Sequence, residues 1–238
     1  MISQRSTVFL YQPEEGYRYN SDSIFLYDFI STFSPKGTLL DIGCGVGILS
    51  LLLSRDFGLK TTIIDKQESM LFYAKHNFAL NALDVEAVWG DIGTFESEQR
   101  FDSIVSNPPF YDSSVTQSKH THLNIARYAH HMPISVLIGA AKRLLAPRGY
   151  FFFCYDAKQV DRVLQALREA KLNPEQLRFV HAKIDREAKI VMIAARAGSR
   201  SMTRVLPPLI VFDQESNYLE APKKAFEKSA THSIKATY

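Results

Sequence analysis

The segment Asp41-Ile42-Gly43-Cys44-Gly45-Val46-Gly47 follows an apolar run at 38–43 and leads into apolar residues with helical spacing over 46–57. It therefore predicts a strand, a glycine-rich turn and a helix. Glycines at such a junction permit a tight turn and a close approach of the backbone to a ligand, and α/β sheets bind nucleotides at this position. The third glycine comes one residue earlier than in the dinucleotide-binding fingerprint. The Asp41 carboxylate would also repel a pyrophosphate and attract a cation such as an amino acid's ammonium group.

Strand-like and helix-like stretches alternate after this segment. Further strands are predicted at 61–65, 85–89, 102–106 and 150–155, helices at 68–80, 133–145 and 161–170, and a closing antiparallel pair at 179–182 and 189–195. This order predicts an α/β fold with a mostly parallel seven-stranded sheet, an antiparallel closing strand and helices on both faces. We expect one domain, with a core over 38–197, an N-terminal segment over 1–37 and a C-terminal extension over 198–238.

Two further predicted strands end in acidic residues. Asp65 ends the second strand, where a carboxylate can accept both hydroxyls of a ribose. Capping of the following helix is the alternative, and we favour ribose binding because the glycine segment lies nearby. In Gly90-Asp91-Ile92, the carboxylate could accept an adenine amino group while Ile92 packs on the ring, or it could simply belong to a turn. The residues alone leave both interpretations open.

The fourth predicted strand ends in Ser106-Asn107-Pro108-Pro109-Phe110. Asn107 offers a side-chain carbonyl acceptor, the two prolines stiffen the backbone, and Phe110 offers a flat face for a planar group. Together they suit a planar nitrogen nucleophile. A rigid turn is the alternative, and the position downstream of the glycine segment argues against it.

These motifs together resemble those of the class I S-adenosylmethionine-dependent methyltransferases, which have a Rossmann-like fold. Asn107-Pro108-Pro109-Phe110 is similar to the motif of family members that methylate adenine N6, cytosine N4 or glutamine N5. The resemblance implies S-adenosyl-L-methionine as cofactor, and it assigns catalysis to the residues of this motif, Asn107, Pro108, Pro109 and Phe110. The cofactor-binding residues that it implies are Tyr19, Asp22, Asp41, Gly43, Gly45, Gly47, Asp65, Lys66, Asp91, Ile92 and Asn107.

Both ends of the chain narrow the resemblance to one subfamily. The stretch from Gly16 to Ser23 and the segment Leu206–Asp213, followed by Tyr218, resemble signatures of the bacterial tRNA (adenine-N6)-methyltransferases that modify adenosine-37 of valine tRNA. In that family the N-terminal stretch lines the methionine end of the cofactor, so residues 1–37 are expected to cap the cofactor and substrate. The family usually has tyrosine at the fourth position of the catalytic motif, and Phe110 would keep the stacking without a hydroxyl contact.

Such a resemblance implies a direct displacement. If Asn107 Oδ1 and the Pro108 carbonyl accept the two hydrogens of an exocyclic amine, its lone pair can point at the sulfonium methyl. Orientation and electrostatic preorganisation would supply most of the catalysis.

Several alternatives compete with this assignment. A glutamine-N5 methyltransferase of the release-factor type usually carries a helical domain ahead of the glycine segment, where this sequence has about 37 residues. A DNA adenine methyltransferase would need a target-recognition domain. Ribosomal RNA stays open as a substrate. An inactive RNA-binding module and a nicotinamide dehydrogenase are disfavoured, because the cofactor and catalytic motifs are intact and the glycine spacing differs.

Composition supports a folded soluble protein. Of 238 residues, 46% are hydrophobic and 22% are charged. A bilayer-spanning helix needs about 20 apolar residues, and no apolar run approaches this length. Residues 1–20 also lack the hydrophobic core of a signal peptide. Cys44 and Cys154 are too few for a disulfide framework, so we expect a reduced cytoplasm.

The charge of the chain is uneven. Residues 141–238 carry 18 lysines and arginines against 10 acidic residues, whereas residues 1–140 carry 10 against 15. The basic half suits a polyanion such as tRNA, and a solvated surface is the alternative. The long loop over 111–131 contains His120, His122, His130 and His131, but no carboxylate or cysteine completes a ligand set, and we expect no metal. The oligomeric state is left open.

Overall fold

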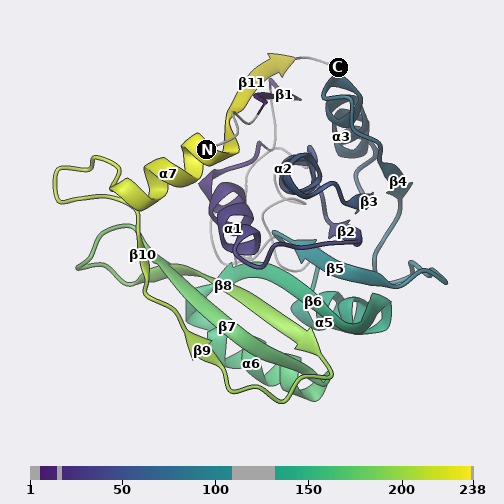
Figure 1. Ribbon diagram of the computed structural model, residues 1–238. Helices are drawn as coiled ribbons and strands as arrows, with labels where there is room; N and C mark the ends of the chain where they lie inside the picture. Colours follow the sequence, from purple (N-terminus) through teal and green to yellow (C-terminus); the bar gives the residue numbers. More distant parts are fainter. Residues whose placement is uncertain (1–5, 15–17, 109–131, 237–238) are drawn as a thin grey trace.

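The computed structural model describes residues 6–14, 18–108 and 132–236. Within these ranges nine strands form the central sheet, in the order β10-β7-β8-β6-β5-β2-β3-β4, with β9 paired to β7 (Figure 1). The strands are β2 (Thr38–Ile42), β3 (Lys60–Asp65), β4 (Glu86–Trp89), β5 (Phe101–Ser106), β6 (Leu145–Asp156), β7 (Leu172–His181), β8 (Ala188–Ala197), β9 (Arg204–Val205) and β10 (Leu209–Ile210).

Helices cover both faces of this sheet. They are α1 (Ser21–Ser31), α2 (Ile48–Phe57), α3 (Glu68–Leu80), α5 (Ile134–Leu144), α6 (Val160–Glu169), which follows the 3₁₀ turn η2 (Ala157–Gln159), and α7 (Glu220–Ser229). One face carries α1, α2 and α3, and the other carries α5 and α6 (Figure 1).

The sheet confirms the predicted fold class. Strands β4, β3, β2, β5 and β6 are mutually parallel, and β8 runs antiparallel to both β6 and β7. These correspond to the seven expected strands, although β7 begins at Leu172, seven residues before the strand predicted at 179–182. The two-residue strands β9 and β10 add to the β7 edge. They were not predicted, because two residues are too few to show an alternating pattern.

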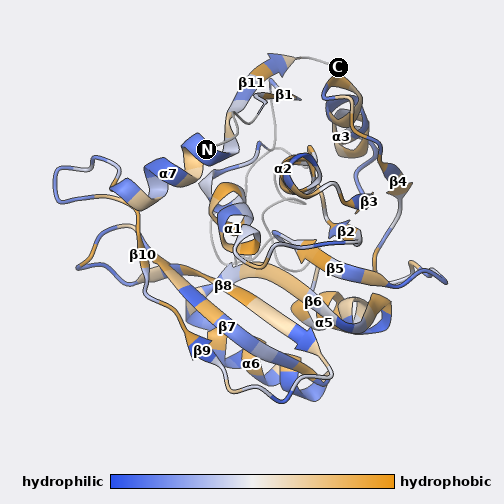
Figure 2. Ribbon diagram, in the orientation of Figure 1, coloured by the Kyte–Doolittle hydropathy of each residue, from blue (hydrophilic) through white to orange (hydrophobic). Residues whose placement is uncertain are grey.

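The core lies along the middle strands (Figure 2). In β6, Phe151, Phe152 and Phe153 are all fully buried, although successive side chains point to opposite faces. A strand covered by helices on both sides buries every residue, so it appears in the sequence as a continuous apolar run. Strand β6 begins earlier than predicted, at Leu145, because an irregular pairing spans the Pro147-Arg148-Gly149 region.

The chain ends form a second, two-stranded sheet that was not predicted. Strand β1 (Val8–Pro13) pairs in parallel with β11 (Thr231–Ala236). Two asparagines bond the other edge of β1. Asn77 of α3 and Asn81, which follows this helix, each accept from one backbone N–H of β1 and donate to the carbonyl of the same residue, at 2.7–3.0 Å. These side chains satisfy an edge that would otherwise be open.

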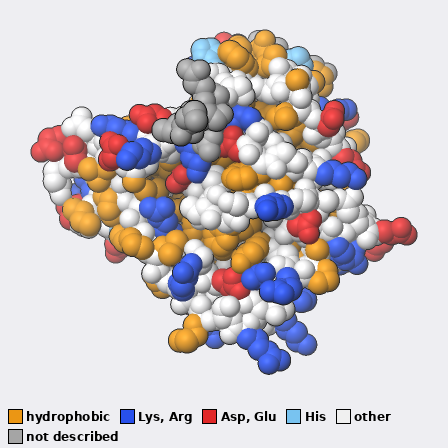
Figure 3. All heavy atoms as spheres, viewed as in Figure 1, with side chains coloured by type: hydrophobic (Ala, Val, Ile, Leu, Met, Phe, Trp, Pro, Cys, Tyr) orange, Lys and Arg blue, Asp and Glu red, His pale blue; other side chains and the backbone are white. Residues whose placement is uncertain are grey.

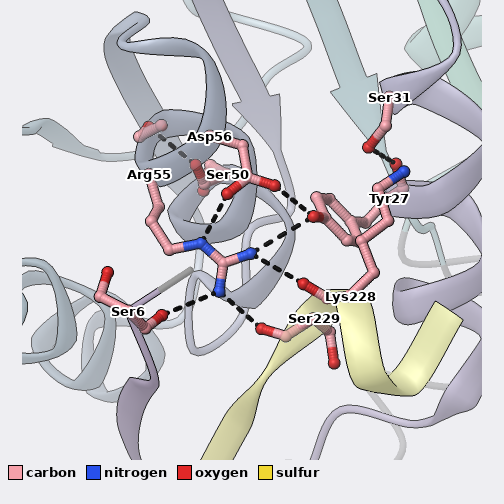
Figure 4. Close-up of polar contacts among 9 residues, drawn as sticks. Ser6, Tyr27, Ser31, Ser50, Arg55, Asp56, Lys228 and Ser229 are labelled. Atoms are coloured by element: carbon pink, nitrogen blue, oxygen red, sulfur yellow. Dashed lines mark hydrogen bonds and ion pairs between the residues drawn. The ribbon is translucent and has the colours of Figure 1, made fainter. Parts of the chain in front are cut away.

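Arg55 of α2 joins the two ends of the chain (Figure 4). Its guanidinium donates to the carbonyls of Ser229 at 2.6 Å, Lys228 at 3.1 Å and Ser6 at 3.3 Å. It also donates to Asp56, at 2.7 Å, and to the Tyr27 hydroxyl, at 3.3 Å. Because a guanidinium has five N–H donors, these contacts use its full capacity in a largely buried place.

Candidate functional site

The carboxyl ends of the parallel strands meet at one edge of the sheet, where most of the predicted site residues lie. The Ile64 carbonyl of β3 accepts from the N–H groups of Gly43, at 2.8 Å, and Cys44, at 3.2 Å. The Ser106 hydroxyl of β5 donates to the Ile42 carbonyl of β2 at 2.8 Å. These bonds hold the ends of β2, β3 and β5 together.

The glycine segment forms a tight turn between β2 and α2. Gly43, Gly45 and Gly47 have positive φ angles of 67°, 55° and 82°, a region that other residues enter at a cost. At Gly47 a side chain would also crowd α3, because its Cβ would lie 3.1 Å from Ala74 Cβ. The backbone conformation of the turn therefore favours glycine at all three positions, and tight packing adds to this at Gly47.

A cavity beside this turn brings together five of the predicted residues, Tyr19, Asp41, Gly43, Gly45 and Asn107. The remaining lining residues are Ser23, Cys44, Val46, Ile48 and Leu49. The cavity thus joins the turn after β2 with the end of β5 and the start of α1. The Tyr19 hydroxyl also shares hydrogen bonds with Thr231 and Ser233 of β11, each at 3.2 Å.

Asp41 contributes a carboxyl group with one unpartnered oxygen to the lining of this cavity. It is 2% exposed, and its Oδ2 has no hydrogen-bond partner among the described residues. Burial raises the pKa of Asp41 to about 7; the nearby Asp65 carboxylate adds to this shift, and hydrogen bonds from Ser50 oppose it. A buried carboxylate oxygen without a partner is costly unless a ligand provides one. It suits the ammonium group of S-adenosylmethionine, so the residues present fit this cofactor.

Asp65 is buried beside the glycine turn but does not line the cavity. Its Oδ2 accepts from Gly45 N–H at 2.9 Å and its Oδ1 from Gln67 N–H at 2.8 Å. Burial raises the pKa of Asp65, against these backbone hydrogen bonds. The carboxylate thus ties the turn to the end of β3. Each carboxylate oxygen retains a further lone pair for a ribose hydroxyl, and Lys66 follows directly.

Other predicted residues lie outside the cavity. Asp91 is exposed and accepts from Gly93 N–H at 2.8 Å, which is a turn contact, while Ile92 is buried. Asp22 lies in the first turn of α1, where its N–H donates to Asn20 Oδ1 at 3.1 Å. Burial raises the pKa of Asp22, against the Asn20 hydrogen bond and the charge of Lys189.

Asn107 lies at the end of β5 with its amide held on both sides. Its Nδ2 donates to Ser23 Oγ at 2.9 Å, and its Oδ1 accepts from the thiol of Cys154 at 2.8 Å. Pro108 is buried. Pro109, Phe110 and the histidine loop over 111–131 lie outside the described residues.

Sequence reasoning missed Ser23 and Cys154 as members of this site. Ser23 belonged to a quoted motif, but its neighbours gave no sign of its partner. Cys154 lies in an apolar run that is typical of a core strand. Only the packing of α1 and β6 against the end of β5 brings these side chains to Asn107.

The described residues lack two further features. No group of three or more histidine, cysteine, aspartate or glutamate side chains there is arranged to hold a metal ion. Among the same residues, every helix is too short or too polar to cross a membrane.

The chain is similar in sequence to known methyltransferases. A family profile described as methyltransferase small domain matches residues 20–170. A tRNA1(Val) (adenine(37)-N6)-methyltransferase of Phocaeicola vulgatus is 29% identical over 187 residues, covering 78% of this chain and 79% of the relative. A ribosomal RNA small subunit methyltransferase C of Actinobacillus pleuropneumoniae is 42% identical over 88 residues, covering 35% of this chain and 26% of the relative.

The fold is shared with solved structures. A protein described as a predicted O-methyltransferase from Agrobacterium tumefaciens superposes with a TM-score of 0.69 at 14% identity, covering 90% of this chain and 100% of that one. Fold and family together define an S-adenosylmethionine-dependent methyltransferase of the Rossmann-like class. The chain belongs to the methyltransferase small domain family.

Proposed function

We propose that this enzyme methylates adenine N6 in tRNA, at adenosine-37 of valine tRNA, in the cytoplasm. The observation that carries the reaction type is that Asn107 lines the same cavity as Asp41 and the glycine turn. An amide acceptor thereby lies beside the cofactor site, where a planar amine would react. The tRNA substrate is supported by the relative that is aligned over 78% of this chain.

Cofactor binding is assigned to the residues around the turn. The Asp41 carboxylate would accept the ammonium group, the backbone of Gly43 and Gly45 would allow close approach, and Asp65 would accept the ribose hydroxyls. When bound, S-adenosylmethionine supplies an electrophilic methyl group on a sulfonium. Tyr19, in the N-terminal segment, would close the methionine end, and its bonds to β11 support a capping role for both chain ends.

The target amine is assigned to the end of β5. Asn107 Oδ1 and the Pro108 carbonyl would accept the two hydrogens of the adenine amino group. The nitrogen lone pair would then leave the plane of the ring and face the methyl group. Phe110 would stack on the base, a contact worth about 1–3 kcal/mol. The base must first leave the stack of the anticodon loop.

The test is methyl transfer from labelled S-adenosylmethionine to total tRNA from a strain that lacks the gene, followed by nucleoside mass spectrometry. We expect N6-methyladenosine in one tRNA, at position 37 of valine tRNA. The matched control is tRNA from the parent strain, which should accept little label because the site is already modified. Label in no tRNA, with the cofactor still bound, would contradict the proposal.

Ribosomal RNA is the second candidate. The 42% identity over 88 residues to a ribosomal RNA methyltransferase favours keeping it. The shorter alignment covers only 35% of this chain, which supports tRNA as the first choice. Ribosomal subunits from the same deletion strain separate the two candidates.

A further inference from the structure

The side-chain amide of Asn107 can serve the proposed reaction in only one of its two orientations. When Oδ1 faces the target amine, the amide accepts a hydrogen bond from it. When the amide is flipped, its own N–H groups face the N–H groups of the amine, and no hydrogen bond can form. The two orientations have almost the same shape, so packing does not distinguish them. Hydrogen-bond partners must select between them.

Two partners contact the amide in the structure. Ser23 Oγ accepts from Nδ2 at 2.9 Å and the Cys154 thiol donates to Oδ1 at 2.8 Å. A hydroxyl can donate or accept, so Ser23 tolerates either orientation. A thiol is a weak acceptor, so Cys154 favours the orientation that places the oxygen toward it. The carbonyl oxygen keeps its second lone pair for the substrate.

The surroundings keep this thiol protonated. Cys154 is fully buried in β6. Burial raises the pKa of Cys154 well above its usual value, and the Asp22 carboxylate adds to this shift. The thiol is therefore a hydrogen donor over the whole working pH range.

We infer that Cys154 and Ser23 are positioning residues that hold the Asn107 amide with Oδ1 available to the target amine, and that Cys154 selects the orientation. The inference rests on the proposed role of Asn107 in the reaction. It also gives a reason for the position of α1, because the first turn of this helix brings Ser23 to the end of β5.

The kinetic test compares three variants of Cys154 in the full chain. Cys154→Val keeps the volume of the side chain but has no hydrogen-bond donor. Cys154→Ala removes both the donor and most of the volume. Cys154→Ser has a hydroxyl donor in place of the thiol. We expect Val and Ala to lower kcat about five- to tenfold, with the KM for RNA and the Kd for S-adenosylhomocysteine within twofold of wild type. Cys154→Ser should recover part of the lost kcat, because its hydroxyl restores a donor to Oδ1, although it can also accept from a flipped amide. Met192→Leu, at the position paired with Cys154 in β8, is the packing control and should keep the wild-type kcat.

A double mutant separates positioning from structure. In an Asn107→Ala background, Cys154→Val should lower kcat no further, because the amide that it orients is gone. Equal losses in Cys154→Ser and Cys154→Val, or an additive loss in the double mutant, would overturn the inference.

An activity-independent measurement distinguishes this inference from the proposed function. The S–H stretching band of Cys154, assigned with Cys154→Ala, should lie at lower wavenumber in the wild type than in Asn107→Leu, because a hydrogen-bonded S–H bond is weakened. An unshifted band overturns the inference whatever RNA is methylated. If the S–H band is shifted but the wild-type enzyme does not methylate tRNA, only the substrate assignment is overturned.

Discussion

At the residue scale, two polar side chains at the edge of the sheet have different chemical roles in the proposed reaction. Asp41 lies at the end of β2 with one oxygen unpaired, and Asn107 lies at the end of β5 with its amide held on both sides. The first is suited to a cationic part of the cofactor and the second to a neutral amine. Their separate roles lead to separate predictions.

Replacement of Asn107 by alanine should lower turnover without loss of cofactor. We expect kcat to fall more than a hundredfold, because an acceptor aligned with the transition state typically contributes about 10²–10³. The Kd for S-adenosylhomocysteine, measured by calorimetry, should stay within threefold of wild type. A loss of turnover below tenfold would mean that the amide is not the acceptor.

Cofactor affinity should depend on the protonation of Asp41. Since the pKa of this carboxyl in the free protein is about 7, a ligand ammonium must displace a proton below that pH. The Kd for S-adenosylhomocysteine should therefore be lowest near pH 8 and rise toward about tenfold per unit below pH 6. Asp41→Asn should bind more weakly at pH 8, with a flat profile. Parallel profiles of the two proteins would contradict this assignment.

The same shift affects the stability of the free protein in the opposite direction. The folded state holds the Asp41 proton up to about pH 7, whereas the unfolded state releases it near its ordinary pKa of about 4. This contribution to stability is therefore complete below pH 4 and is lost as the pH rises through 7.

At the element scale, the glycine turn, the first turns of α1 and α2 and the end of β5 line the cavity. Arg55 of α2 binds the carbonyls of Ser6, Lys228 and Ser229, which flank β1 and β11. Strand β11 in turn bonds the Tyr19 hydroxyl at the cavity. Elements that are far apart in the sequence therefore hold the lining of the cavity in place.

Replacement of Arg55 by alanine should destabilise the protein strongly. The substitution leaves Asp56 buried beside a cavity and leaves carbonyl groups without donors. Losses from breaking a buried ion pair are about 3–5 kcal/mol, which chemical denaturation would measure. Arg162→Ala, on the exposed side of α6, is the control and should cost less than about 0.5 kcal/mol. Similar denaturation midpoints for the Arg55 and Arg162 variants would show that the Arg55 contacts contribute little to the free energy of unfolding.

At the scale of the whole molecule, the basic residues of the C-terminal half are distributed over several helices and strands. Lys and Arg side chains gather at the lower end of the view in Figure 3, over the region of α6, β7 and β9. Arg196 lies opposite Tyr150, at the end of the β6–β8 pairing that is away from the site. Lys189 lies at the start of β8, near the carboxyl end of β6, and Arg186 precedes it on the same hairpin.

If tRNA enters at the catalytic edge, the basic residues there should matter most. We expect Arg186→Glu with Lys189→Glu to weaken tRNA binding at least tenfold, and Lys171→Glu with Arg200→Glu, on the opposite edge, to weaken it less. The wild-type Kd should rise steeply with salt, and the slope should fall in the first variant because fewer counterions are released. Filter binding at several salt concentrations measures both effects. A salt-independent Kd would exclude phosphate contacts.

The sequence alone determined the order of strands and helices in the core over 38–197 and the chemical class that its motifs indicate. Continuous apolar runs mark doubly covered strands such as β6, and helical spacing marks α3 at its observed bounds, because periodicity records burial. The glycine turn and the Asn107 motif were recognisable because each is a contiguous stretch whose backbone conformation is local.

Only the tertiary structure decided which side chains meet. Ser23 and Cys154 reach Asn107 from 84 and 47 residues away, and β1 pairs with β11 across nearly the whole chain. The short strands β9 and β10 likewise exist only because β7 offers an edge. A local pattern states that a residue is buried but does not name its partner, because the partner is set by how the layers pack.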